Sequence, residues 1–289
     1  MKQLLVLSGK GGTGKTTIVS ALIELMKAKV FADCDVDAPN LHLIFNQYDE
    51  KIKNDYYGLP IAKIDSYKCI ECGACFENCK FDAINRENGY TVLPHACEGC
   101  GVCELVCPVD AISLNDNITG YLNLYKTNQY NFSSATLKMG SGNSGKLVSE
   151  VKKQMNDNTI DSIVSIVDGS PGIGCPVIAS LSGSDIVLFV TEPSVSGLSD
   201  LKRVVETAKI FNPKMFACIN KYDINIEKSK DICDYCKNEN ILVIGKIPYD
   251  KMISKCIDDN INFIDKNYSG SKEIRNMYKI LYKYINEEK

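Results

Sequence analysis

Apolar positions near the start of the chain follow the pattern of a parallel α/β sheet. Residues 2–7 (KQLLVL) predict a short buried strand, and residues 8–14 are rich in glycine. Residues 15–28 carry apolar side chains at helical spacing, and residues 29–34 (KVFADC) predict a second buried strand. Strand, loop, helix and strand in this order predict a sheet whose first two strands are parallel and joined by a helix.

Similar patterns return after residue 146 and continue to the end of the chain. Before them, residues 121–125 favour a strand, and residues 140–145 form a loop rich in Gly, Ser and Asn. The last helix carries an apolar stripe that includes Ile274 and Leu281, and packing on the sheet is the commoner use of such a stripe. We expect helices at residues 146–156, 198–211, 227–239 and 270–287, and strands at residues 160–167, 185–191, 214–219 and 241–247.

Residues 60–118 have a different character, with short elements and many Cys and Gly residues. Two segments within this stretch, 69–84 and 97–112, align as CIECGACFENCKFDAI and CEGCGVCELVCPVDAI. An internal duplication is the natural interpretation. We therefore expect one α/β domain formed by residues 1–59 and 119–289, with a small domain of residues 60–118 inserted after its second strand.

Charge and hydropathy limit the partners that the chain can have. The chain has 289 residues, of which 45% are apolar, and its net charge of −3 is spread without a basic stripe. A dedicated nucleic-acid surface needs such a stripe, so we expect no nucleic-acid partner. No run of about 18 apolar residues is present, and the N-terminus does not resemble a secretory signal. We expect a cytoplasmic protein that does not depend on a membrane.

Eight of the fourteen Cys residues follow a regular spacing. Each half of the duplication has the form Cys-x₂-Cys-x₂-Cys-x₃-Cys, which matches the two-cluster ferredoxin run, in which the fourth Cys binds the other cluster. A reducing compartment argues against disulfides, and a zinc site would favour pairs of Cys. The spacing predicts two [4Fe–4S] clusters, one held by Cys69, Cys72, Cys75 and Cys107, the other by Cys97, Cys100, Cys103 and Cys79.

The purpose of these clusters is open to two interpretations. Irons that all carry Cys ligands have no open coordination position, which favours electron transfer over substrate chemistry. Alternatively, the clusters only stabilise a small domain that lacks a large core. Among the other Cys residues, we expect Cys175 to be buried and Cys233 and Cys236 to lie within a helix rather than bind a ligand. Cys34, Cys218 and Cys256 are expected in the core.

The glycine-rich loop after the first strand fits the phosphate-binding pattern G-x-x-x-x-G-K-[ST]. Its backbone N–H groups and the following helix N-terminus suit phosphate oxygens. Lys15 is expected to reach the β- and γ-phosphates of ATP, and Thr16 to bind Mg²⁺. The expected nucleotide-binding residues of this loop are Gly9, Lys10, Gly11, Gly12, Thr13, Gly14, Lys15, Thr16 and Thr17.

The segment KGGTGKTT, with its early Lys10, resembles the deviant Walker A loop of the MinD/ParA/nitrogenase iron protein family. The resemblance implies that Lys10 crosses a dimer interface to the partner's ATP, which makes the active unit a homodimer. The alternative is that Lys10 contacts only its own phosphates. The segment that begins at Asp33 resembles the family's D-x-D motif, which implies that Asp35 orients the attacking water and that Asp33 lies nearer Mg²⁺.

Four further positions complete the resemblance. The apolar strand that ends in Asp168 has the Walker B form, so Asp168 is expected to hold Mg²⁺ through water. The following segment resembles switch II, in which the Gly172 N–H would sense the γ-phosphate. Asn220 and Pro248 resemble the two loops that contact adenine, although Asn220 could instead cap a helix.

Taken together, these residues predict an α/β P-loop fold, a three-layer parallel sheet with helices on both faces, plus an inserted small α+β ferredoxin-like domain. The resemblance extends to the ferredoxin-containing subgroup of MinD-like ATPases. The first hypothesis is a switch ATPase that couples ATP, Mg²⁺ and the two clusters to electron delivery to a redox or Fe–S partner protein. The alternatives are a cluster scaffold or carrier, and a positioning or regulatory ATPase whose clusters sense redox state.

Overall fold

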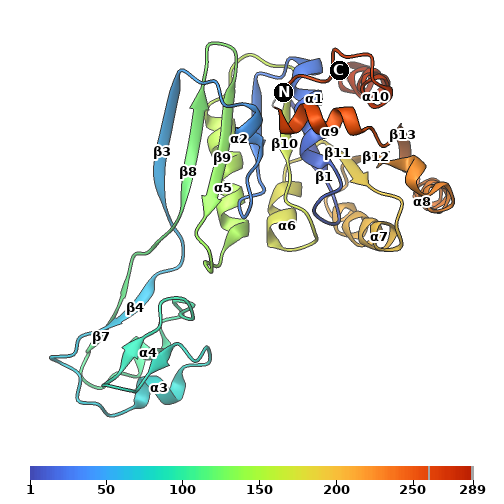
Figure 1. Ribbon diagram of the computed structural model, residues 1–289. Coiled ribbons are helices and arrows are strands. Elements are labelled where there is room, and N and C mark those ends of the chain that lie inside the picture. Colours follow the sequence, from blue (N-terminus) through green and yellow to red (C-terminus); the bar gives the residue numbers. More distant parts are fainter. Residues whose placement is uncertain (260, 288–289) are drawn as a thin grey trace.

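The computed structural model describes residues 1–259 and 261–287, which form a large α/β unit and a smaller lobe (Figure 1). Within these residues, the large unit has one nine-stranded sheet. Its strands are, in spatial order, β13 (Leu242–Ile247), β12 (Lys214–Asn220), β11 (Ile186–Thr191), β1 (Lys2–Leu7), β10 (Val164–Asp168), β2 (Val30–Asp33), β9 (Asn131–Leu137), β8 (Ile118–Lys126) and β3 (Glu50–Tyr57).

The sheet is parallel from β13 to β9, whereas β8 and β3 are antiparallel to their neighbours. The predicted α/β class is confirmed and the sheet is mostly parallel, but the predicted parallel arrangement does not hold at this edge. The reason is local: β8 and β9 are joined by a short turn in which Thr127 N bonds to the Tyr130 carbonyl. A connection of this length can only join antiparallel strands.

Helices cover both faces of the sheet, because successive side chains of each buried strand point to opposite faces. In β1, Leu4 and Val6 face one core and Leu5 and Leu7 face the other. The first core is covered by α1 (Lys15–Met26), α9 (Lys251–Asp258) and α10 (Ser269–Glu287). The second is covered by α5 (Ser144–Asp157), α6 (Cys175–Leu181), α7 (Val195–Lys209) and α8 (Ile226–Asn238). Two short helices, α2 (Leu41–Ile44) and η1 (Tyr222–Ile224), lie in connecting segments.

The apolar stripe of α10 packs inward, as the sequence predicts. Ile274, Leu281 and Ile285 are at most 2% exposed and belong to the first core. No helix in the described ranges has both the length and the apolar composition that crossing a membrane requires.

The smaller lobe has its own sheets and its own core. Strand β4 (Ile61–Ile64) pairs with β7 (Ile112–Asn115), and β5 (Ile84–Asn85) pairs with β6 (Thr91–Val92). Helices α3 (Ala74–Asn78) and α4 (Val102–Leu105) complete the lobe. Its small core is made by the buried side chains of Ala62, Cys75, Ile84 and Ile112.

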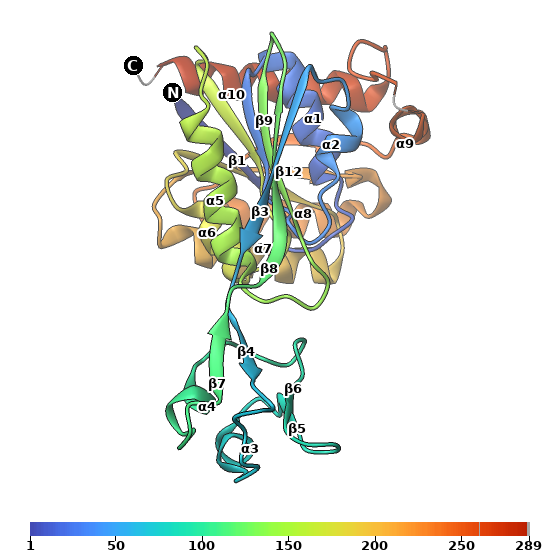
Figure 2. The same ribbon diagram turned by 90° about the vertical axis from the view of Figure 1, so that its left-hand side faces the viewer.

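The lobe is carried on the two edge strands of the large sheet (Figures 1 and 2). The chain enters it after β3 and returns through β8, so the predicted insertion point after the second strand is wrong by one strand. Strand β8 begins where β9 ends, since Gly120 lies opposite Leu137. The lobe therefore leaves the sheet at the carboxyl ends of the parallel strands, the same edge at which β1 runs into the glycine-rich loop.

Candidate functional site

The glycine-rich loop lies between β1 and α1 and ends in a left-handed turn. Gly12 and Gly14 have φ values of 78° and 85°, which side chains other than glycine rarely adopt. A Cβ at Gly14 would lie 2.3 Å from Asn220 Nδ2. Glycine at this position therefore permits both the turn and the close approach of the loop that follows β12.

Three of the predicted residues meet directly below this loop. The buried ammonium of Lys15 forms an ion pair with Asp168 Oδ1, and Thr16 Oγ1 donates to Asp168 Oδ2 at 2.7 Å. Burial opposes the charge of Lys15, but the neighbouring carboxylates, Asp168 first among them, raise its pKa above the ordinary value. The arrangement places a permanent positive charge, a hydroxyl and a carboxylate at the start of α1, a donor set suited to phosphate and Mg²⁺.

The two Asp residues after β2 have different surroundings. Asp33 is fully buried and accepts backbone hydrogen bonds, each of 3.0 Å, from Asp35 N, Asn40 N and Leu41 N. Burial raises the pKa of Asp33 to about 7, and the charge of Asp168 adds to this shift. Burial also raises the pKa of Asp35, although the charge of Lys15 opposes the shift. Asp33 thus holds the loop in shape, while Asp35 is a second carboxylate close enough to interact with Lys15.

The segment after β10, predicted as switch II, forms hydrogen bonds to the segments that follow β1 and β2. The Gly172 N–H, expected to sense the γ-phosphate, donates to the Ser8 carbonyl at 3.0 Å. Ser170 Oγ donates to the Cys34 carbonyl at 2.5 Å. For Gly172 to reach a nucleotide, its bond to Ser8 would have to break.

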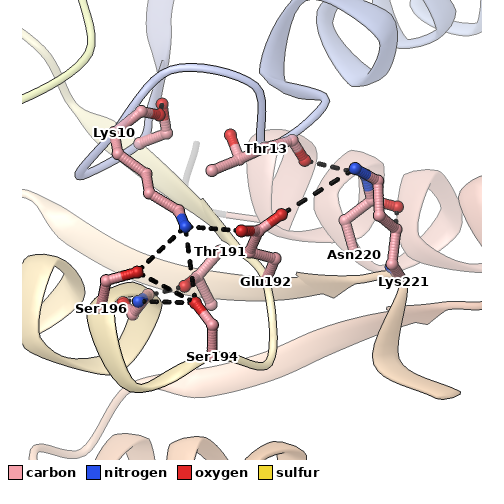
Figure 3. Close-up of polar contacts among 10 residues, drawn as sticks. Lys10, Thr13, Thr191, Glu192, Ser194, Ser196, Asn220 and Lys221 are labelled. Atoms are coloured by element: carbon pink, nitrogen blue, oxygen red, sulfur yellow. Dashed lines mark hydrogen bonds and ion pairs between the residues drawn. The ribbon is translucent and has the colours of Figure 1, made fainter. Parts of the chain in front are cut away.

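Lys10 does not point into the site below its own loop (Figure 3). Its Nζ lies 2.5 Å from Glu192 Oε1 and donates to Ser196 Oγ at 3.1 Å and to Ser194 Oγ at 3.4 Å. Glu192 Oε2 also lies 3.9 Å from Lys221 Nζ. The sequence predicts no role for Glu192, which lies between β11 and α7 in a segment that is rich in Ser.

A cavity of about 190 Å³ opens beside the glycine-rich loop. It is lined by Gly14 and Thr17 on one side and by Asn220 and Pro248, the two predicted base-contacting residues, on the other. Asn220 Nδ2 donates to the Thr13 carbonyl at 2.8 Å, so its side chain bridges to the phosphate-binding loop. The helix-cap alternative does not apply to Asn220, because a different residue, Asn225, caps α8.

The eight regularly spaced Cys residues surround two separate cavities in the small lobe. These are the two quartets that the ferredoxin-type spacing predicts. Ala111 N donates to Cys107 Sγ at 3.2 Å. One cavity is lined by Cys69, Cys72, Cys75 and Cys107, and the other by Cys79, Cys97, Cys100 and Cys103.

A single metal ion needs its ligands grouped around one point, which is a different arrangement from that around a cluster. Over residues 1–259 and 261–287, no three His, Cys, Asp or Glu side chains are grouped as one ion would require. A cubane distributes its four Cys ligands over four irons, so these ligands do not converge on one point. Cluster binding by the two quartets stays a prediction.

Three predictions about the remaining Cys residues can be compared with the structure. Cys34, Cys218 and Cys256 are buried, as predicted. Cys233 and Cys236 lie within α8, as predicted, and burial raises the pKa of Cys236 to about 12. The prediction that Cys175 is buried is wrong: it is exposed, because it begins α6 at the carboxyl edge of the sheet.

Comparison with known proteins agrees with this geometry. Residues 4–263 match the CobQ/CobB/MinD/ParA nucleotide binding domain. An uncharacterized protein of Methanocaldococcus jannaschii is 35% identical over 286 residues, which cover 98% of this chain and 97% of that protein. A second one from the same organism is 29% identical over 277 residues and covers 91% of each.

Solved structures share the fold at lower identity. The septum site-determining protein MinD of Pyrococcus horikoshii, solved with Mg-ADP, has a TM-score of 0.58 at 17% identity, covering 100% of this chain and 98% of that one. A Cyanothece McdA variant in complex with ATP has a TM-score of 0.59 at 16% identity, covering 98% and 96%. A chain of the MinC:MinD cell division protein complex from Aquifex aeolicus has a TM-score of 0.54 at 19% identity, again covering 98% and 96%. The chain belongs to the CobQ/CobB/MinD/ParA nucleotide-binding family and has the fold of a MinD/ParA-type P-loop ATPase.

Proposed function

We propose that this chain is a regulatory switch ATPase, in which Mg-ATP brings two copies together and hydrolysis separates them. The observation that carries the proposal is that the two Lys residues of the glycine-rich loop have different partners. Lys15 lies buried against Asp168 and Thr16, where phosphate and Mg²⁺ would bind. Lys10 extends away from that site to Glu192, on the surface at which a second copy would meet it.

Each residue of the site has a distinct task in this proposal. Lys15 neutralises the β- and γ-phosphates, and Thr16 and Asp168 hold Mg²⁺, with Asp33 fixing the loop behind them. Asp35 orients the water that attacks the γ-phosphorus, which releases ADP and phosphate. Adenine occupies the cavity between Thr17, Asn220 and Pro248.

The ATP-bound dimer requires two contacts to change. Lys10 leaves Glu192 and reaches the partner's nucleotide, as the resemblance to the family implies. Gly172 exchanges its bond to the Ser8 carbonyl for one to the γ-phosphate. Both contacts are made within one protomer, so they compete with the contacts to nucleotide and to the partner copy. The protein can therefore alternate between a state with the internal contacts and an ATP-bound dimer.

The small lobe would supply the regulatory input. In the proposal its two Cys quartets hold two [4Fe–4S] clusters, a role that suits an all-Cys donor set around two separate cavities. Such clusters supply one-electron redox chemistry when bound. The relatives of known fold include a MinD bound to MinC, and they favour a positioning or regulatory ATPase with a protein partner over the electron-delivery hypothesis.

Two experiments test the two halves of the proposal. ATP hydrolysis by the purified protein should require Mg²⁺ and disappear in Lys15→Met; hydrolysis that persists in this variant would refute the assigned site. Anaerobically purified protein should contain about eight irons per chain, the content of two such clusters. Iron-free protein with intact ATPase activity would remove the clusters from the proposal and leave the switch.

A further inference from the structure

Helices α5 and α6 are held together at both ends of α6. At the start, the Gly145 backbone approaches α6 so closely that a Cβ on it would lie 3.0 Å from Cys175 Cβ and 3.1 Å from the Cys175 carbonyl oxygen. At the other end, Lys152 Nζ donates to the carbonyls of Ser180 and Ser182, each at 2.5 Å. Two attachments about two helical turns apart make the helices behave as one body.

The Lys152 contact is specific to this pair of helices. The Lys152 side chain is only 7% exposed, and burial lowers its pKa to about 8. At neutral pH it therefore still carries its charge and three donors. Ser180 and Ser182 lie at the carboxyl end of α6, where the helix field favours a cation. An uncharged side chain of the same length would leave these carbonyls without this donor.

Helix α6 follows switch II directly. Gly172, whose N–H is bonded to the Ser8 carbonyl, lies three residues before the first residue of α6. A movement of Gly172 toward a nucleotide therefore pulls on the start of α6. Since α5 is attached to both ends of α6, α5 should move with it.

The loop that precedes α5 approaches the small lobe. The loop of residues 138–143 leads from β9 into α5 and extends toward the lobe (Figure 1). A Cβ on Gly142 would lie 3.9 Å from Glu98 Oε2, and Glu98 stands between Cys97 and Cys100. The lobe is otherwise joined to the sheet by a narrow connection, in which Gly58 N bonds to the Asn117 carbonyl at 3.3 Å. The loop before α5 therefore meets the lobe beside one Cys quartet.

We propose that α5 and α6 form a rigid connector that transmits movement of switch II to the Glu98 turn of the lobe, with Lys152 as the positioning residue that couples the two helices. The inference rests on the proposed function in one respect, the movement of switch II with nucleotide. Coupling of this kind is reciprocal, so a change at the Cys quartet beside Glu98 would alter nucleotide affinity by the same factor.

Hydrogen–deuterium exchange on the full-length, anaerobically purified protein tests the connector. Exchange is compared between Mg-ADP and Mg²⁺ with a non-hydrolysable ATP analogue, in segments 168–174, 138–146 and 96–104. In the wild type all three segments should change, the last by about fivefold, the lower end of coupling between sites. In Lys152→Met the change should persist in 168–174 and become smaller in the other two segments, because only the Gly145 contact with Cys175 then joins the two helices. The exposed neighbour Lys153→Met is the matched control and should behave as wild type.

A second variant keeps the test valid if Lys152→Met does not fold. Glu98→Ala lies on the exposed turn of the lobe and should retain the changes in 168–174 and 138–146 but lose the one in 96–104, whereas Glu104→Ala should retain all three. A wild-type protein in which 168–174 responds and 96–104 does not would overturn the connector alone. No response in 168–174 would overturn the switch proposal and the connector with it. Equal responses in Lys152→Met and wild type would show that Lys152 does not couple the helices.

Discussion

The contact between Lys10 and Glu192 predicts that removing one carboxylate strengthens the ATP-dependent dimer. Glu192→Gln keeps the size of the side chain but removes the charge that holds Lys10 at 2.5 Å. If Lys10 must leave Glu192 before it can reach the partner's nucleotide, the wild-type dimer forms at the expense of this ion pair. The variant has no ion pair to break when it dimerises, so its dimer should be tighter.

The magnitude follows from the exposure of the pair. The Lys10 and Glu192 side chains are 32% and 24% exposed, so the interaction is screened and we assign it about 1 kcal/mol, the upper end for surface pairs. An energy of about 1 kcal/mol corresponds to a factor of about five. A dimer releases two such contacts, which gives about a 25-fold lower dimer dissociation constant.

Sedimentation equilibrium with Mg²⁺ and a non-hydrolysable ATP analogue measures this constant. Glu206→Gln is the matched control, because Glu206 pairs with Lys209 on the surface of α7 at 2.6 Å and should not affect dimerisation. The combined variant Lys10→Met, Glu192→Gln should show no gain over Lys10→Met alone. A Glu192→Gln dimer that is as weak as, or weaker than, the wild-type dimer would refute the reasoning.

Three other changes have defined outcomes. Lys15→Met should weaken Mg-ATP binding about 100-fold in equilibrium dialysis, since a buried ammonium makes charged hydrogen bonds to phosphate, whereas unchanged affinity would contradict its role. Cys107→Ala should halve the iron content by emptying the quartet that contains Cys69, while Cys175→Ala should change nothing; an unaltered iron content in Cys107→Ala would exclude the interleaved ligand sets. Phe132→Ala should cost about 3–5 kcal/mol in chemical unfolding, because its fully buried ring stacks on Phe31 and Tyr125, and Phe132→Leu should cost less.

Local motifs allowed the sequence to predict the phosphate-binding loop and the two Cys quartets. The loop depends on consecutive residues between β1 and α1, so spacing alone identifies it. The quartets depend on a duplicated pattern within 60–118, and the structure groups the same eight residues around two cavities. Interactions between residues close in sequence are those that spacing rules describe best.

Elements without an apolar pattern were missed. Strand β3 is an edge strand in which only Tyr56 is buried, so its sequence EKIKNDYY has no alternation to detect. Strand β9 is buried but contains Ser133 and Ser134, and Ser133 Oγ is satisfied by the Val151 carbonyl at 2.9 Å. In the sequence, a polar residue whose hydrogen-bond partner lies on a neighbouring helix looks like a loop residue.

The role of Glu192 could not be predicted because it depends on distance in space. Lys10 and Glu192 are 182 positions apart and meet only because β1 and β11 are neighbours in the sheet. The pairing of α5 with α6 through Lys152 has the same origin, since its acceptors are backbone carbonyls that carry no sequence signature. Such contacts follow from strand order, which the motifs do not specify.

The central claim is that Lys10 acts on the nucleotide of the partner, and mixed dimers test it most directly. Lys10→Ala keeps Lys15 in its own phosphate-binding site but cannot supply Lys10 to a partner. Lys15→Met can supply Lys10 to a partner, but its own phosphate-binding site is defective. Each variant alone should hydrolyse ATP at a negligible rate. If Lys10 acts across the interface, mixing the two should restore hydrolysis at the Lys10→Ala sites. A mixture no more active than its separate components would contradict the account.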